Sequence, residues 1–379
     1  MSSSSSGVFE FSAGPGVLPA CVKAEIAANL VDFEGHGRSI VEMSHRGDTV
    51  VRVADEAEAS LRALLNVPPT HTILFMQGGG TAQFAAVPLN LAHGASASAD
   101  YAVTGTWTVA AAKEASKYVA VREVLNVQKS AGRFVAVPPQ SAWRTAVDAD
   151  ADATPPAYLY YTDNETVNGV EFSWVPTPAS PRTELVCDMS SNFLSRPVDV
   201  SRFGVIYAGA QKNCGIAGLT IVIVKKSLLD RRRADTPVVL EYKATDEKKS
   251  MFNTPPVFAI YVAGLVFKWI LREGGVAAME QRAKQRSEAL YAAIDASNGF
   301  YVAPVEVSAR SRMNVVFRIK GGDEALERKF VSEAQAAGLH TLEGHRSVGG
   351  LRASLYNAMP MEGVEALLAF MAAFRARNT

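Results

Sequence analysis

The sequence has few cysteines, and none of them are closely paired. Only three of its 379 residues are cysteine, Cys21, Cys187 and Cys214, and no two of them form a C-x-x-C pair. An odd number of widely spaced cysteines gives neither a metal-ligand pattern nor a disulfide framework, so we expect no metal site and no disulfides. Such a chain fits a reducing compartment, and the expected location is the cytoplasm.

Long apolar runs are also missing. The longest nearly apolar stretch, Val257 to Leu271, is interrupted by Lys268. It is shorter than the roughly 20 apolar residues needed to span a bilayer, so we expect a buried core helix there. The first residues, MSSSSSGVFEF, have neither the basic nor the apolar region of a secretory signal. Their serine run is expected to form a flexible tail.

An excess of charge of either sign is absent as well. Lysine and arginine total 38, and aspartate and glutamate also total 38. This balance gives no sign of a general affinity for nucleic acids or membranes, although it is compatible with a small basic pocket. Hydrophobic residues make up 48% of the chain and charged residues 20%, which are ordinary values for a globular protein.

The sequence does contain a regular alternation of apolar strands and helical patterns. A helix is expected over Thr49–Leu65, where apolar residues recur at helical spacing. Because the apolar runs are continuous, they are typical of strands covered on both faces. The alternation predicts an α/β fold with a mainly parallel central sheet. The expected strands are Thr72–Met76, Asp100–Thr104, Ala157–Tyr161, Glu184–Cys187, Gly204–Ala208 and Leu219–Val224.

The pattern changes after about residue 270, where long charged helices alternate with short strands. We therefore predict a large domain over residues 17–270 and a smaller α+β domain over residues 271–379, on which residues 1–16 pack. The segment from Gln128 to Pro156 is expected to be a variable surface region. The elements expected in the smaller domain are helices at Glu273–Ala293, Gly322–Ala337 and Val364–Arg377 and strands at Met313–Ile319 and Leu351–Leu355.

A glycine-rich turn, QGGGTAQF from Gln77 to Phe84, lies between an expected strand and an expected helix. Three glycines let the backbone approach a ligand closely, and the following helix N-terminus offers free N–H groups to an anion. The motif is neither a Walker loop nor the dinucleotide fingerprint. A phosphate site and a plain tight turn both fit it.

Asp188 and Lys212 each follow an expected strand. Strand ends of an open α/β sheet meet at one edge, where such folds bind ligands. Pyridoxal phosphate requires this combination, a lysine that bonds to its aldehyde carbon and a carboxylate that faces its ring nitrogen. A loop cap and a surface lysine are the alternative interpretation.

Further candidates are two His-Arg dipeptides and a tryptophan. His45-Arg46 and His345-Arg346 could bind an anion, since arginine favours carboxylate and phosphate. Solvated surface charge is the alternative. Trp107 follows the strand expected over Asp100–Thr104 and could stack on a flat ring or belong to the core.

At these residues the sequence closely resembles the phosphoserine aminotransferase family, which consists of class-V, fold-type-I pyridoxal-phosphate enzymes. The resemblance runs from about Phe11 to the C-terminus. The matching stretches are FSAGPGVLP, MSHRGD, QGGGTAQFAAVP, NETVNGV, CDMSSNFLSRPVDVSRFGVIYAGAQKN, SMFNTPP, SRMNVVF and EGHRSVGGLRASLYNAMP.

The resemblance implies a role for each candidate residue. Lys212 would bond to the cofactor and shuttle the proton, Asp188 would pair with the ring nitrogen, and Trp107 would stack on the ring. Thr166 would contact the ring hydroxyl. The cofactor phosphate would be held by Gly80, Thr81 and Gln211, and by Asn253 and Thr254 of the second subunit of a homodimer. The substrate's distal anion would be recognised by His45, Arg46, His345 and Arg346, and its α-carboxylate by Arg352.

The implied reaction is ping-pong transfer of an amino group between L-glutamate and 3-phosphohydroxypyruvate, giving O-phospho-L-serine and 2-oxoglutarate in serine biosynthesis. Thr81, Ala82 and Ile216 depart from residues common in the family. The open alternatives are an alanine–glyoxylate or serine–pyruvate aminotransferase, a cysteine desulfurase, a dinucleotide-dependent oxidoreductase and a non-catalytic scaffold.

Overall fold

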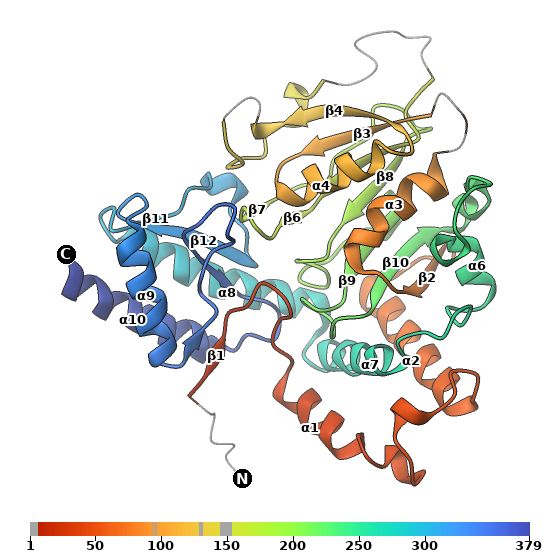
Figure 1. Ribbon diagram of the computed structural model, residues 1–379, viewed down its shortest axis with the longest axis horizontal. Coiled ribbons are helices and arrows are strands. Elements are labelled where there is room, and N and C mark those ends of the chain that lie inside the picture. Colours follow the sequence, from red (N-terminus) through yellow and green to blue (C-terminus); the bar gives the residue numbers. More distant parts are fainter. Residues whose placement is uncertain (1–6, 93, 95–96, 129–131, 145–153) are drawn as a thin grey trace.

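The computed structural model describes residues 7–379 apart from 93, 95–96, 129–131 and 145–153. A large unit surrounds a seven-stranded sheet, and a smaller unit surrounds a three-stranded sheet (Figure 1). The serine run and part of the segment expected to be a variable surface region lie outside the described residues.

The helices and strands of the described residues agree closely with the sequence prediction. Each strand expected from an apolar run in the large unit begins and ends within one or two residues of the expected position. The helices are α1 Ala20–Asn29, α2 Asp48–Leu65, α3 Gly79–Leu91, α4 Thr106–Ala115, α6 Tyr242–Glu247, α7 Val257–Arg272, α8 Gly275–Asp295, α9 Glu324–Ala336 and α10 Met361–Asn378. The strands are β1 Phe9–Glu10, β2 His71–Met76, β3 Ser98–Val103, β4 Ala120–Asn126, β5 Tyr158–Thr162, β6 Asn164–Glu165, β7 Val170–Glu171, β8 Glu184–Asp188, β9 Val205–Gly209, β10 Thr220–Lys225, β11 Tyr301–Val302, β12 Asn314–Ile319, β13 Leu339–His340 and β14 Leu351–Ser354.

The large sheet has the order β2-β10-β9-β8-β5-β3-β4. All neighbouring pairs from β9 to β4 are parallel, which confirms the mainly parallel sheet. The exception is β10, which runs antiparallel to both β2 and β9. A continuous apolar run fits either direction, so the sequence pattern did not reveal this reversal.

Both faces of the large sheet are covered. Ile73 and Phe75 of β2 point into a core shared with α2 and α7, whereas Leu74 and Met76 point into a second core shared with α3 and α4. This alternation explains why every residue of β2 is buried and why its last four residues, from Ile73 to Met76, are all apolar.

Helix α7 is the core helix expected from the longest apolar stretch. Most of its residues are buried, and it packs against α2 and α1. Within the described residues, no helix combines the length and the apolar character needed to cross a membrane.

The smaller unit packs α8, α9 and α10 around the antiparallel sheet β11-β12-β14. The chain's N-terminal segment lies on this unit. Strand β1 pairs in parallel with β13, with Phe9 opposite Leu339, and Phe11 is fully buried in the same core (Figure 1).

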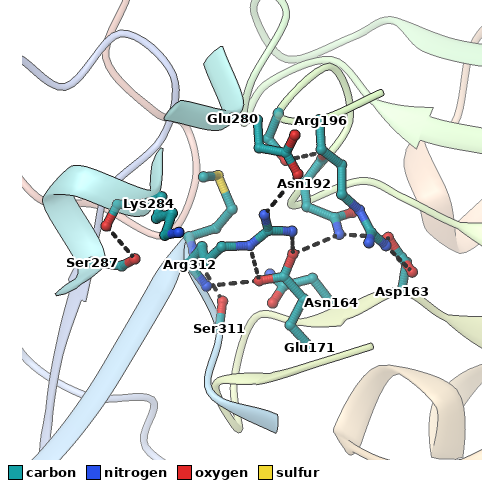
Figure 2. A network of polar contacts seen from close by, with 12 residues as sticks. Asp163, Asn164, Glu171, Asn192, Arg196, Glu280, Lys284, Ser287, Ser311 and Arg312 are labelled. Atoms are coloured by element: carbon teal, nitrogen blue, oxygen red, sulfur yellow. Dashed lines mark hydrogen bonds and ion pairs between the residues drawn. The ribbon is translucent and has the colours of Figure 1, made fainter. Parts of the chain in front are cut away.

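A buried polar network joins the two units (Figure 2). Arg312 of the smaller unit donates to Glu171 of β7 at 2.9 Å and to Glu280 of α8 at 3.2 Å. In the large unit, Arg196 forms an ion pair with the buried Asp163, with an N–O distance of 2.6 Å. The Asn192 amide links the two pairs by donating to both Asp163 and Glu171. Charged groups buried in this way are stable only while each keeps its partner.

Candidate active site

The two residues chosen from strand ends lie at the ends of adjacent strands. Strands β8 and β9 are parallel, and Asp188, the last residue of β8, lies opposite Tyr207 of β9. Lys212 follows β9 after a short turn. The Asp188 and Lys212 side chains therefore line one cavity, together with the glycine turn at Gly80 and Thr81.

The amino group of Lys212 is held in this cavity by the Thr166 side chain. Its Nζ donates to Thr166 Oγ1 at 2.8 Å and lies 5.8 Å from the centre of the Trp107 ring. The pKa of Lys212 is lowered to about 8, mainly by burial and also by Arg352, against the raising effect of Asp188 and Glu165. A sizeable fraction of this lysine is therefore neutral near pH 8, as a nucleophile or a general base must be.

Asp188 is buried and oriented by its own loop. Its Oδ1 accepts the Ser190 N–H at 2.8 Å, and its Oδ2 faces the glycine turn. A Cβ added at Gly80 would lie 3.7 Å from that Oδ2 and 3.6 Å from Ser190 Oγ. A side chain at position 80 would therefore extend into the space between the turn and the carboxylate.

The N-terminal segment also reaches the lysine. The Gly16 N–H donates to the Gln211 carbonyl at 2.7 Å, and a Cβ added at Gly14 would lie 3.4 Å from Lys212 Cγ. The Tyr356 hydroxyl donates to the Ala13 carbonyl at 2.6 Å. Composition and periodicity did not assign this segment to the site; only the stretch FSAGPGVLP drew attention to it.

A basic group lies beside the cavity in the smaller unit. Arg352 of β14 donates weakly to the Thr166 carbonyl at 3.4 Å, and its buried Nε has no acceptor in the described part of the chain. Partial burial, Arg352 and Arg346 together lower the pKa of His345. The structure thus brings together Arg352, His345 and Arg346.

The other His-Arg pair is elsewhere in the chain. His45 and Arg46 precede α2, at the lower right of Figure 1, whereas the sheet with β12 lies at the left. None of the contacts among the described residues joins this pair to Lys212 or to His345.

The loop with Asn253 and Thr254 lies next to the glycine turn of its own chain. Gln77 Nε2 donates to the Thr254 carbonyl at 2.9 Å, and Asn253 and Gly78 line a shallow pocket there. This position is on the outer side of the turn, whereas Gly80 and Thr81 line the cavity with Lys212.

The residues around Lys212 fit pyridoxal phosphate. The cavity combines an amine, a carboxylate, an aromatic face and a glycine turn that begins α3. Trp107 Nε1 is a buried donor that has no acceptor among the described atoms, which leaves it available to a ligand. The α3 N-terminus favours a phosphate through its free N–H groups.

The comparisons with known proteins agree on one family. A family model described as aminotransferase class-V matches residues 8–367. The phosphoserine aminotransferases of Laribacter hongkongensis and Drosophila melanogaster are each 51% identical to the chain, and each comparison covers 98% of this chain and 99% of the relative.

Solved structures give the same result. A phosphoserine aminotransferase from Bacillus circulans subsp. alkalophilus superposes with a TM-score of 0.91 at 40% identity, covering 97% of this chain and 98% of its own. A pyridoxal-phosphate-bound one from Trichomonas vaginalis gives 0.89 at 40%, covering 96% and 99%. The chain therefore belongs to the class-V aminotransferases and, among them, to the phosphoserine aminotransferase family.

Proposed function

We propose that the protein transfers the amino group of L-glutamate to 3-phosphohydroxypyruvate by a ping-pong mechanism, giving 2-oxoglutarate and O-phospho-L-serine for serine biosynthesis. The observation that carries the proposal is the position of the Arg352, His345 and Arg346 group beside the Lys212 amine. Both substrates carry an α-carboxylate and a distal anion, so one basic group can serve both in turn.

Within this proposal, Arg352 binds the α-carboxylate. Its guanidinium is largely buried between Thr166 and the smaller unit, and burial lowers its pKa. A substrate carboxylate that pairs with this guanidinium would offset the free-energy cost of burying its charge. Arg346 is exposed and His345 is half-buried, and both would bind the distal phosphate or carboxylate at the mouth of the site.

Lys212 would act as the general base, since its lowered pKa keeps the amine partly neutral at working pH. It would move a proton from the substrate Cα, with Thr166 Oγ1 holding Nζ in place between uses. Bound pyridoxal phosphate supplies the electron sink for this chemistry. Asp188 would face its ring nitrogen, Trp107 would cover its ring, and Gly80, Thr81 and Gln211 would hold its phosphate.

We also propose that the active form is a cytoplasmic homodimer. Asn253 and Thr254 lie on the outer side of the glycine turn, and the neighbouring Val239 and Phe252 are 58% and 39% exposed. Large exposed apolar side chains of this kind suit a protein interface. Across it, Asn253, Thr254, His45 and Arg46 would complete the partner's site, since in their own chain they lie apart from Lys212.

An aminotransferase for a substrate without a distal anion remains the alternative. An alanine–glyoxylate aminotransferase structure from Nostoc superposes with a TM-score of 0.76, but at 18% identity the likeness concerns the fold alone. Such a substrate would leave His345 and Arg346 without a ligand.

The test is a comparison of amino acceptors. With pyridoxal phosphate and glutamate present, 2-oxoglutarate should form with 3-phosphohydroxypyruvate and form far more slowly with glyoxylate or pyruvate. Arg346→Gln should reduce the ratio of the rate with 3-phosphohydroxypyruvate to the rate with glyoxylate. Lys212→Ala should abolish turnover with every acceptor. Equal rates with glyoxylate and 3-phosphohydroxypyruvate would refute the phosphoserine assignment while leaving the aminotransferase.

A further inference from the structure

Glu165 is a buried carboxyl group to which the proposed reaction assigns no role. Its side chain is fully buried at the end of β6, directly before Thr166. Isolated buried carboxylates are costly, so a carboxyl in this position needs compensating donors. Its donors come from a single element, the first turn of α4.

The carboxyl group caps α4 from outside the helix. Glu165 Oε2 accepts the Trp107 N–H at 2.9 Å, and Oε1 accepts the Thr108 N–H at 2.8 Å and the Thr108 hydroxyl at 2.6 Å. Asn168 accepts the preceding N–H, from Thr106, at 2.8 Å. The β6–β7 hairpin thus satisfies three successive N–H groups that a helix start leaves unpaired.

The sequence at the helix start makes this external cap necessary. The N-cap residue of α4 is Gly105, which has no side chain that could accept a hydrogen bond. A Cβ at position 105 would lie 2.2 Å from Glu165 Cδ, so only glycine admits the carboxyl group to the helix end. Capping of α4 by Glu165 therefore requires glycine at position 105.

The same hairpin holds the reacting side of the cavity. Thr166, the next residue, accepts Lys212 Nζ through its hydroxyl and Arg352 through its carbonyl. Two consecutive residues therefore position the two sides of the cavity. Glu165 fixes the backbone of Trp107, and Thr166 holds the amino group of Lys212.

The charged groups around the cavity also shift one another's pKa values. Asp188 and Glu165 both raise the pKa of Lys212, whereas burial and Arg352 lower it. Burial raises the pKa of Glu165 itself to about 7, against the hydrogen bonds from Thr108 and Trp107 and with a further raising effect from Asp188.

We propose that Glu165 is a positioning residue of the cofactor site, which fixes the Trp107 face through the first turn of α4 and, above neutral pH, places a negative charge near Lys212. The inference rests on the proposed use of pyridoxal phosphate. Glu165 itself is not among the residues that line the cavity with Lys212.

The experiment uses the cofactor-free full-length protein and pyridoxal phosphate as the probe. The rate at which the yellow lysine-bound band appears is measured from pH 6 to pH 10, which gives the midpoint for Lys212, and the dissociation constant of the cofactor is measured at one pH. The variants are Glu165→Gln, which removes the charge, and Glu165→Asp, which keeps the charge but shortens the side chain. Glu184→Gln is the matched control, because Glu184 lies at the opposite end of β8 from Asp188.

Glu165→Gln should lower the Lys212 midpoint by about one pH unit, the effect of one nearby charge. It should also weaken cofactor binding about tenfold, because one carboxylate oxygen becomes an NH2 group that cannot accept, so that either the Trp107 N–H or the Thr108 N–H loses its partner. Glu165→Asp should weaken binding while leaving the midpoint near that of the wild type, and Glu184→Gln should change neither value.

The proposal would be overturned if the Glu165→Gln variant kept both the wild-type Lys212 midpoint and the wild-type affinity for pyridoxal phosphate. If that variant does not fold, an unchanged cofactor affinity in Glu165→Asp would overturn it instead. A wild-type protein that never forms the yellow band would refute the proposed function itself, which separates that failure from the failure of the inference.

Discussion

The charges around Lys212 oppose one another. Burial and Arg352 favour the neutral amine, whereas Asp188 and Glu165 favour the protonated one. The lowered pKa therefore reflects a balance, which single substitutions shift in directions that can be stated in advance.

Arg352→Gln should raise the Lys212 midpoint above its starting value near 8, because a nearby positive charge is removed. The pH dependence of Lys212 modification by an amine-directed reagent, followed by peptide mass spectrometry in the cofactor-free protein, measures the midpoint. Arg346→Gln is the matched control, since Arg346 has no resolved influence on Lys212, and should leave the midpoint in place. A midpoint that falls in Arg352→Gln would contradict the charge balance described here.

Sequence reasoning found the residues that follow strand ends and missed those whose role depends on tertiary contact. The sequence pattern could identify Asp188 and Lys212, because the ends of parallel strands meet at one edge of a sheet. It could not identify Glu165, because the partners of that residue, Trp107 and Thr108, lie 57 or 58 residues away in the chain. An isolated glutamate within a short strand gives no such signal.

Among the secondary-structure elements, α4 depends most visibly on its neighbours. It is short, has a glycine as its N-cap residue, and its first N–H groups are capped by the β6–β7 hairpin. The sequence predicted the strand before Gly105 but gave no indication of what caps the helix. Side-chain patterns report which face is buried, whereas a cap supplied by another element is visible only in the folded chain.

Gly105→Ala should destabilise the protein by about 1–3 kcal/mol, the usual cost of overpacking. The added methyl group would overlap the Glu165 carboxyl group, which is held in place by the Trp107 and Thr108 N–H groups. Chemical denaturation of the cofactor-free protein measures the loss. Gly7→Ala, where an added Cβ would meet no atom within 4 Å, is the control and should leave stability unchanged. Equal stability of both variants would mean that α4 does not need the close approach of Glu165.

The two units of the chain are tied together by buried charge. Glu171 of the large unit and Arg312 of the smaller unit form the contact, and the Glu171 side chain is almost fully buried (Figure 2). The division at residues 270 and 271 stays a prediction, since α7 and α8 follow one another closely and pack together.

Glu171→Gln should destabilise the protein by about 3–5 kcal/mol, because Arg312 would remain partly buried without its strongest partner. Thermal and denaturant unfolding measure the loss. The control is Glu288→Gln on α8, which removes an exposed ion pair with Lys284 and should change stability by no more than about 0.5 kcal/mol. Similar effects of the two substitutions would show that the buried network does not tie the units together.

The overall architecture was largely predictable, whereas the joining of the two His-Arg pairs in one anion site stays a prediction. Strand–helix alternation gave the α/β sheet, although it could not reveal that β10 is reversed. The two His-Arg dipeptides were considered together because of their chemistry. In the single chain, His345 and Arg346 lie beside Arg352, whereas His45 and Arg46 lie at the start of α2.

The most direct test of the proposed function is the visible absorption spectrum of the protein with pyridoxal phosphate bound. Glutamate should bleach the yellow band, and 3-phosphohydroxypyruvate added afterwards should restore it, which would establish the cofactor, the amino donor and the acceptor together. A protein that never forms the yellow band with pyridoxal phosphate, or one whose band glutamate leaves unchanged, would contradict the assignment of Lys212 and of the aminotransferase reaction.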